Sequence, residues 1–141
     1  MIKALIDTNV ILDALASREP FNADAEKLFM LAAEEKFQGF ITANSVTDIY
    51  YIVRKNLSDA MAREAIRNLL QLFSIVGISG AECETALDSA ITDYEDALLA
   101  ECAAKAGVNY IVTRNADFLK AQSEVALITP AAFITKGYTN V

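Results

Sequence analysis

The sequence predicts an α/β fold, a three-layer α/β/α sandwich whose central parallel sheet has four to five strands. Two observations lead to this expectation: short apolar runs recur along the 141 residues, and segments of helical periodicity separate them. Parallel strands need long crossovers, so strands that alternate with helices favour a parallel sheet covered on both faces. The length suits one domain, which we expect to cover residues 1–141.

The strands are expected where apolar residues run together. The first run, IKALI, ends at Asp7 and is typical of a strand buried on both faces. The expected strands cover residues 2–6, 39–42, 74–78 and 109–113, with a weaker fifth at 126–129.

The helices are expected between these runs. In one segment Ala25, Leu28, Phe29 and Ala32 share a helical face, and Gly107 is a plausible stop for the last long helix. A helix should follow Asp7, and the other expected helices cover residues 22–36, 45–55, 58–72, 80–91 and 94–106.

The composition excludes several chemistries. The chain has no His, which rules out Ser-His-Asp triads, Cys-His pairs, HExxH zinc sites and histidine bases. A net charge of −7 argues against a protein that holds nucleic acid through a broad basic face. Catalysis would therefore depend on carboxylates, hydroxyls, lysine, thiols or a bound metal.

Cysteine content and hydropathy indicate the compartment. Cys83 and Cys102 are too far apart for a CxxC motif, so a reducing cytoplasm is the expected location. Asp7 and Asp13 interrupt the apolar N-terminus, which we expect to belong to the fold rather than to a signal peptide. No apolar stretch is long enough to suggest a membrane span.

Acidic residues follow the first two strands, at the sheet edge where ligands bind in open parallel sheets. Asp7 ends the first strand, and Thr8 and Asn9 add polar groups at the turn. The alternative is that Asp7 only caps the next helix. Asp48 lies one to two turns into the helix after the second strand, where Ser45 and Asp48 also resemble a capping box.

Two further acidic segments lie near residues 93 and 117. Asp93 and Asp96 share a helical face, whereas Glu95 is expected to be mostly structural, in a capping box with Thr92. The fourth long apolar run leads into a last polar set, where Asn115 could act as an N-cap and Asp117 as an acid favoured by the helix dipole. That set consists of Thr113, Asn115 and Asp117.

These acids are ambiguous singly, but the strand ends that carry them should meet at one edge of the sheet. Carboxylates about 4 Å apart repel by about 4 kcal/mol per pair, so such a cluster must take up protons or bind cations. Oxygen ligands without His or Cys favour Mg²⁺ or Mn²⁺. Ions of this kind activate water and stabilise phosphate oxyanions.

Four short motifs then occur in a particular order: LIDTNVILD, SVTDIYYIVRK, EDALLAECA and VTRNADF. In these motifs and their order, the chain resembles PIN-domain ribonucleases over nearly its whole length. The resemblance implies a PIN-like, Rossmann-like fold. Closely similar small PIN proteins, of the VapC type, are the toxins of bacterial toxin-antitoxin pairs.

The resemblance places the family's acidic site on Asp7, Asp48, Asp96 and Asp117, and it implies Asp7, Asp96 and Asp117 as metal ligands. Relatives more often carry Glu at the position of Asp48, and they often have two residues where Ala116 alone stands here. The further candidate site residues are Asp93, Thr8, Asn9, Thr113, Asn115 and Arg114.

The resemblance also implies a function and partners: a Mg²⁺- or Mn²⁺-dependent endoribonuclease with an RNA substrate, a cognate antitoxin and a homodimeric state. Helices at 22–36 and 45–72, with Tyr50, Tyr51 and Phe73, are candidates for the protein contacts. The candidate basic contacts to RNA are Arg54, Lys55, Arg63, Arg67, Arg114 and Lys120.

The main alternative is a PIN-like protein-interaction module whose site is weak or inactive. An aspartyl-phosphate phosphatase is a poor match, since it resembles DxDx(T/V), whereas Thr8 and Asn9 follow Asp7 without a second Asp. Nucleotide-binding loops of the GxxxxGK or GxGxxG type do not occur in the sequence.

Overall fold

A computed structural model of the protein describes residues 1–139, so residues 140 and 141 of the expected domain lie outside the described part. It contains a five-stranded sheet of order β3-β2-β1-β4-β5, in which every neighbouring pair is parallel. The expected parallel sheet is confirmed, and the weak fifth run does form its edge strand. The strands are β1 (Lys3–Ile6), β2 (Gln38–Thr42), β3 (Ser74–Val76), β4 (Tyr110–Val112) and β5 (Ala126–Ile128).

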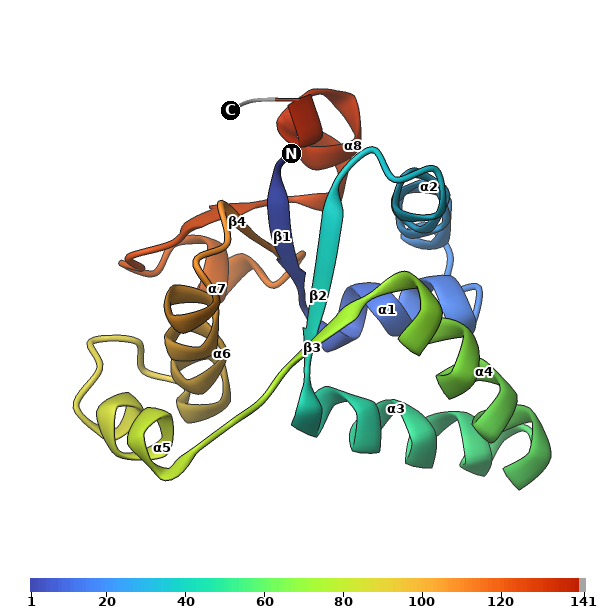
Figure 1. Cartoon of the computed structure of the whole chain (residues 1–141), viewed down its shortest axis with the longest axis horizontal. Helices are drawn as coiled ribbons and strands as arrows, with labels where there is room; N and C mark the ends of the chain where they lie inside the picture. Colours follow the sequence, from blue (N-terminus) through green and yellow to red (C-terminus); the bar gives the residue numbers. More distant parts are fainter. Residues whose placement is uncertain (140–141) are drawn as a thin grey trace.

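Helices cover both faces of the sheet and complete three layers (Figure 1). One apolar core gathers residues of α1, α2, α3, α4 and α8, and the other gathers residues of α5, α6 and α7. The bounds are α1 (Thr8–Leu15), α2 (Asn22–Ala33), α3 (Ala43–Asn56), α4 (Asp59–Leu72), α5 (Gly80–Leu87), α6 (Tyr94–Ala106), α7 (Ala116–Leu119) and α8 (Pro130–Thr135).

The central strand β1 shows why the sheet must be covered on both sides. Ala4 and Ile6 belong to the first core and Leu5 to the second, and all three are fully buried. Because alternate side chains of a strand point to opposite faces, this apolar run can be dry only between two helical layers. Among residues 1–139, no helix is long and apolar enough to cross a membrane.

The helix boundaries differ from the expectation mainly near residues 116 and 130. The four-residue α7, the six-residue α8 and a 3₁₀ turn at Gly137–Thr139 were not predicted, because helices this short show no hydrophobic periodicity. Gly107 does end α6, in the left-handed conformation (φ 68°) that glycine adopts at little cost.

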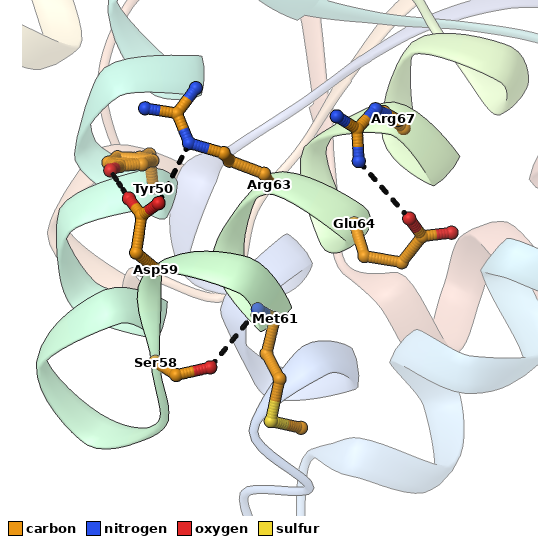
Figure 2. A network of polar contacts seen from close by, with 7 residues as sticks. All are labelled: Tyr50, Ser58, Asp59, Met61, Arg63, Glu64 and Arg67. Carbon is orange, nitrogen blue, oxygen red and sulfur yellow. Dashed lines mark hydrogen bonds and ion pairs between the residues drawn. The ribbon is translucent and has the colours of Figure 1, made fainter.

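Polar contacts join α3 and α4 into a helical hairpin (Figure 2). The hydroxyl of Tyr50 donates to Asp59, whose Oδ2 also accepts from Arg63 Nε at 2.9 Å. One turn further on, Arg67 pairs with Glu64 at 3.3 Å. Exposed pairs like these contribute little stability, but they hold both guanidinium groups against their own helix.

Phe73 does not belong to the surface of this hairpin. It was expected among candidate partner contacts, yet it is buried at the end of α4, where its ring packs edge-on against Phe29 at 5.3 Å. Its ring also lies over Gly39 of β2, so that close approach depends on the missing side chain. Tyr51, by contrast, is exposed as expected.

We predict that Gly39→Ala destabilises the fold. The new Cβ would lie 2.5 Å from Cδ1 of Phe73, so the buried ring must shift. Overpacking of this kind costs about 1–3 kcal/mol, measurable as a lower free energy of unfolding in urea. Gly77→Ala is the matched control, because no atom beyond the adjacent residues in the described chain lies within 4 Å of its Cβ position. Equal stability of the two variants would contradict the prediction.

A second polar contact ties α5 to α6. The Ser79 hydroxyl donates to Glu82 Oε2 at 2.6 Å, and Lys105 of α6 donates to Glu82 Oε1 at 2.6 Å. The Lys105 ammonium and the Ser79 donors hold the pKa of Glu82 near 2, below its usual value of 4.5. Lys105 also donates to the carbonyl of Gly77 at 3.0 Å, so this contact fixes α6 against the loop after β3.

The Glu82 contact makes stability fall in acid. Because the folded-state pKa is depressed, its contribution is present above pH 4.5 and is lost as pH falls towards 2. We expect Glu82→Gln to unfold at a lower temperature than the wild type at pH 7, and the gap to narrow at pH 3. Glu84→Gln, an exposed change on the same helix, is the control. A gap that stays constant with pH would refute this account.

Candidate functional site

The carboxyl end of β1 delivers Asp7 to the predicted sheet edge. Its backbone amide donates to the carbonyl of Val112 at 3.0 Å, which continues the pairing of β1 with β4. Asp7 stands at the N-cap of α1, but its carboxylate accepts a hydrogen bond at 2.8 Å from the hydroxyl of Thr113, which follows β4. Within the described residues, no side-chain capping bond to α1 forms, so capping alone does not explain Asp7.

Hydroxyl groups connect the starts of α1 and α3. Ser45 Oγ lies 2.7 Å from Thr8 Oγ1 and 2.9 Å from Thr42 Oγ1. The expected capping box of Ser45 with Asp48 is wrong: α3 begins at Ala43 after Thr42, and Ser45 turns inward to these partners. Asp48 is therefore left exposed on the first turns of α3.

The first turn of α6 brings three acids to the same place. Asp93 is its N-cap, and Asp93 Oδ1 accepts from the amide of Asp96 at 3.0 Å. The expected capping box of Thr92 with Glu95 is therefore wrong by one residue. Because Asp93 rather than Thr92 provides the cap, Glu95 is the second residue of the helix and not the third, which a capping box requires.

The sheet edge carries a cavity of about 410 Å³ lined by groups from four segments of the chain. It brings together the predicted residues Asp7, Thr8, Asn9, Asp48, Asp93, Asp96 and Asn115, and it adds Leu12, Tyr51, Ile52 and Glu95. Five carboxylates therefore face one space. Sequence reasoning missed Glu95, although three acids within four residues at one helix start were a signal for it.

Asp117 lies beside this cavity rather than in its lining. It is exposed in the first turn of α7 and lines a neighbouring space of about 610 Å³ together with Asp93 and Asp96. Asn115 acts as the N-cap of α7, as one alternative expected: its Oδ1 accepts from the amides of Asp117 and Phe118 at 3.0 and 3.3 Å.

Burial and crowding of the acids raise the pKa values of three of them. Partial burial, followed by the charges of Asp93 and Asp7, raises the pKa of Asp96 from 3.8 to about 6. Burial also raises the pKa of Asp7, against the hydrogen bond from Thr113. The pKa of Glu95 rises through burial and then the charge of Asp48. Such shifts mark groups whose ionised form is disfavoured in its surroundings, as is common at functional sites.

A family model described as PIN domain matches residues 3–117, which include every residue of this acidic cavity. The chain belongs to the PIN domain family.

Solved structures share this PIN fold. A toxin-antitoxin complex from Klebsiella pneumoniae is 25% identical, with a TM-score of 0.66 over 90% of this chain and 97% of that one. VapC20 of Mycobacterium tuberculosis, a sarcin-ricin-loop-cleaving toxin, is 13% identical with a TM-score of 0.63 over 82% and 92%. A DNA-bound VapBC from Salmonella typhimurium is 15% identical, with a TM-score of 0.66 over 92% and 99%. A search of curated proteins finds no match.

The donor set of the acidic cavity fits a hard divalent cation. Its polar groups are carboxylate, hydroxyl and amide oxygens, and the raised pKa of Asp96 shows that added positive charge would be favourable there. Within residues 1–139, no three acidic or thiol side chains are close enough to form a complete cage. Mg²⁺ does not need one, because it usually binds through one or two carboxylates and keeps several waters.

Arg114 lies next to Asn115 of the acidic cavity, but its side chain pairs with a buried residue of the protein. Its Nε and Nη2 donate to the two carboxylate oxygens of Asp13 at 2.6 and 3.0 Å. Its guanidinium carbon also lies 4.1 Å from the ring centroid of Phe21. The guanidinium that was expected to contact RNA is therefore already paired with Asp13.

We predict that Asp96→Asn stabilises the protein at pH 7 in metal-free buffer. A raised folded-state pKa means that the wild type loses stability as pH rises from 3.8 through about 6, and Asn removes this cost. After discounting for solvent screening, the gain is about 1 kcal/mol, visible as a higher melting temperature. At pH 4 the gain should vanish. A variant less stable than the wild type at pH 7 would contradict the cost assigned to burial and to the neighbouring acids.

Proposed function

We propose that the protein is a divalent-metal-dependent endoribonuclease, the toxin of a toxin-antitoxin pair, that hydrolyses RNA phosphodiester bonds. The observation that carries the proposal is the convergence of carboxylates from β1, α3 and α6 on one cavity, with the pKa of Asp96 raised to about 6. Membership of the PIN family and likeness to a toxin described as cleaving the sarcin-ricin loop support it.

Asp7 and Asp96 would hold Mg²⁺ or Mn²⁺, with Asp117 and Asp93 at the side shared with the neighbouring cavity. The bound ion would lower the pKa of a water and offset charge on the phosphate. Thr113 keeps the Asp7 carboxylate oriented through its hydrogen bond. Asp48 and Glu95 line the opposite part of the cavity, where a carboxylate can orient a water or accept its proton.

The protein would work with two kinds of partner: a cognate antitoxin and a second copy of the chain. Three of the similar solved structures are toxin-antitoxin complexes. On this chain, a groove of about 380 Å³ between α3 and α4 offers exposed Tyr51 together with Val46, Tyr50 and Ile66. We propose a cytoplasmic, membrane-free location for the pair, as expected for a toxin that acts on RNA.

The test is RNA cleavage by the pure protein. The wild type should cut structured RNA with Mg²⁺ or Mn²⁺ and not with EDTA. Asp96→Asn should lose at least about 100-fold in rate, because even partners behind the ligands are worth about 10–100-fold. Asp88→Asn, an exposed change at the end of α5, is the matched control and should retain full activity.

The same experiment distinguishes the ribonuclease from the alternative function, an inactive interaction module. Protein that binds Mn²⁺ yet leaves RNA intact with every metal would favour an inactive PIN-like interaction module. Equal activity of the wild type and Asp96→Asn would show that a contaminant does the cutting. Co-purification with the product of a short adjoining reading frame, and loss of cleavage in that complex, would support the antitoxin partner.

A further inference from the structure

Asp13 is a buried carboxylate outside the acidic cavity. It lies in the last turn of α1 with only 1% of its surface exposed. Arg114 reaches it from the loop after β4 with two charge-assisted hydrogen bonds, and Nη1 of Arg18 lies 3.9 Å from Asp13 Oδ1. A carboxylate buried this far is tolerated only when paired and hydrogen-bonded, so this contact has a defined geometry.

The backbone around Arg114 leads directly to the acidic site. Thr113, the preceding residue, is fully buried and donates to Asp7 Oδ2. Asn115, the following residue, donates its amide to Thr113 Oγ1 at 3.1 Å. A shift of Arg114 would therefore move the hydroxyl that orients Asp7 and the N-cap of α7.

We propose that Arg114 is a positioning residue, whose bidentate pair with buried Asp13 fixes the 113–115 loop and, through Thr113, the carboxylate of Asp7. Its guanidinium edge of Nε and Nη2 is occupied by Asp13, and one face covers Phe21, so the side chain is committed to α1 and the start of α2. An arginine is needed because lysine cannot supply two parallel donors.

The rival role is a direct contact between Arg114 and an RNA phosphate. Substitution of Asp13 distinguishes the two roles. If Arg114 acts through Asp13, removing either partner has the same effect, and removing both adds nothing. If Arg114 binds phosphate, Asp13→Asn would release the guanidinium and leave RNA binding intact. Arg18→Gln is the matched control, since it removes a cation beside Asp13 without touching the loop.

The first test uses the metal-free protein and needs no activity. Hydrogen exchange at the amide of Asn115 should speed up in Arg114→Gln and in Asp13→Asn, and stay unchanged in Arg18→Gln. Melting temperatures identify any variant that fails to fold, and Arg114→Lys, which keeps the charge, should give an intermediate rate. Unchanged exchange in the folded Arg114→Gln variant would overturn the proposal.

The second test measures Mn²⁺ affinity by electron paramagnetic resonance. Both Arg114→Gln and Asp13→Asn should weaken binding by about 10–100-fold, the usual effect of losing a residue that orients a ligand. Affinity equal to the wild type in both variants would overturn the role assigned to Asp7. This readout stays valid if the protein cuts no RNA, so failure of the proposed ribonuclease function is distinguished from failure of this inference.

The third test rests on the proposed function and uses cleavage kinetics. A positioning role predicts that kcat falls in both variants with KM little changed, and that the double variant is no worse than either one. A raised KM in Arg114→Gln, with Asp13→Asn behaving as wild type, would identify Arg114 as a direct RNA contact and overturn the proposal.

Discussion

The parallel sheet brings several carboxylates to one edge, where they repel one another. The rest of the site depends on that repulsion. With β1 between β2 and β4, the carboxyl ends of these strands open onto one edge, where the starts of α3 and α6 also lie. Asp7, Asp48 and Asp96 are then neighbours although they are far apart in the chain. Burial, followed by repulsion from Asp93 and Asp7, raises the pKa of Asp96, and this rise reflects the cost of the arrangement.

Hydrogen bonds around the acids hold the segments that carry them in place against this repulsion. Thr113 holds Asp7, the Ser45 hydroxyl joins α1 to α3, and Asp93 caps the helix that carries Asp96. The first two bonds link elements that meet at the sheet edge, and the third lies within the start of α6. The Asp7 carboxylate is therefore oriented by a neutral hydroxyl, which does not neutralise its charge.

The sequence predicted what depends on local pattern. Apolar runs placed the five strands, and acids after them placed the site, because both follow from residue order alone. The short helices α7 and α8 were not predicted, because they lack hydrophobic periodicity. Thr129 before Pro130 was nevertheless a usable start signal for α8. The pair of Asp13 and Arg114 could not be predicted, because it joins residues 101 positions apart through a contact that only the packed fold creates.

The proposed RNA substrate is a polyanion, whereas the protein carries a net charge of −7. Several cations expected to attract RNA are engaged elsewhere: Arg63 with Asp59, Arg67 with Glu64 and Arg114 with Asp13. Such pairs reduce the attraction that these groups can offer a phosphate. Five carboxylates line the cavity, so attraction for a phosphate there would come from cations supplied by the solution. If the cavity holds divalent ions as proposed, binding of RNA should depend on those ions more than on any basic surface.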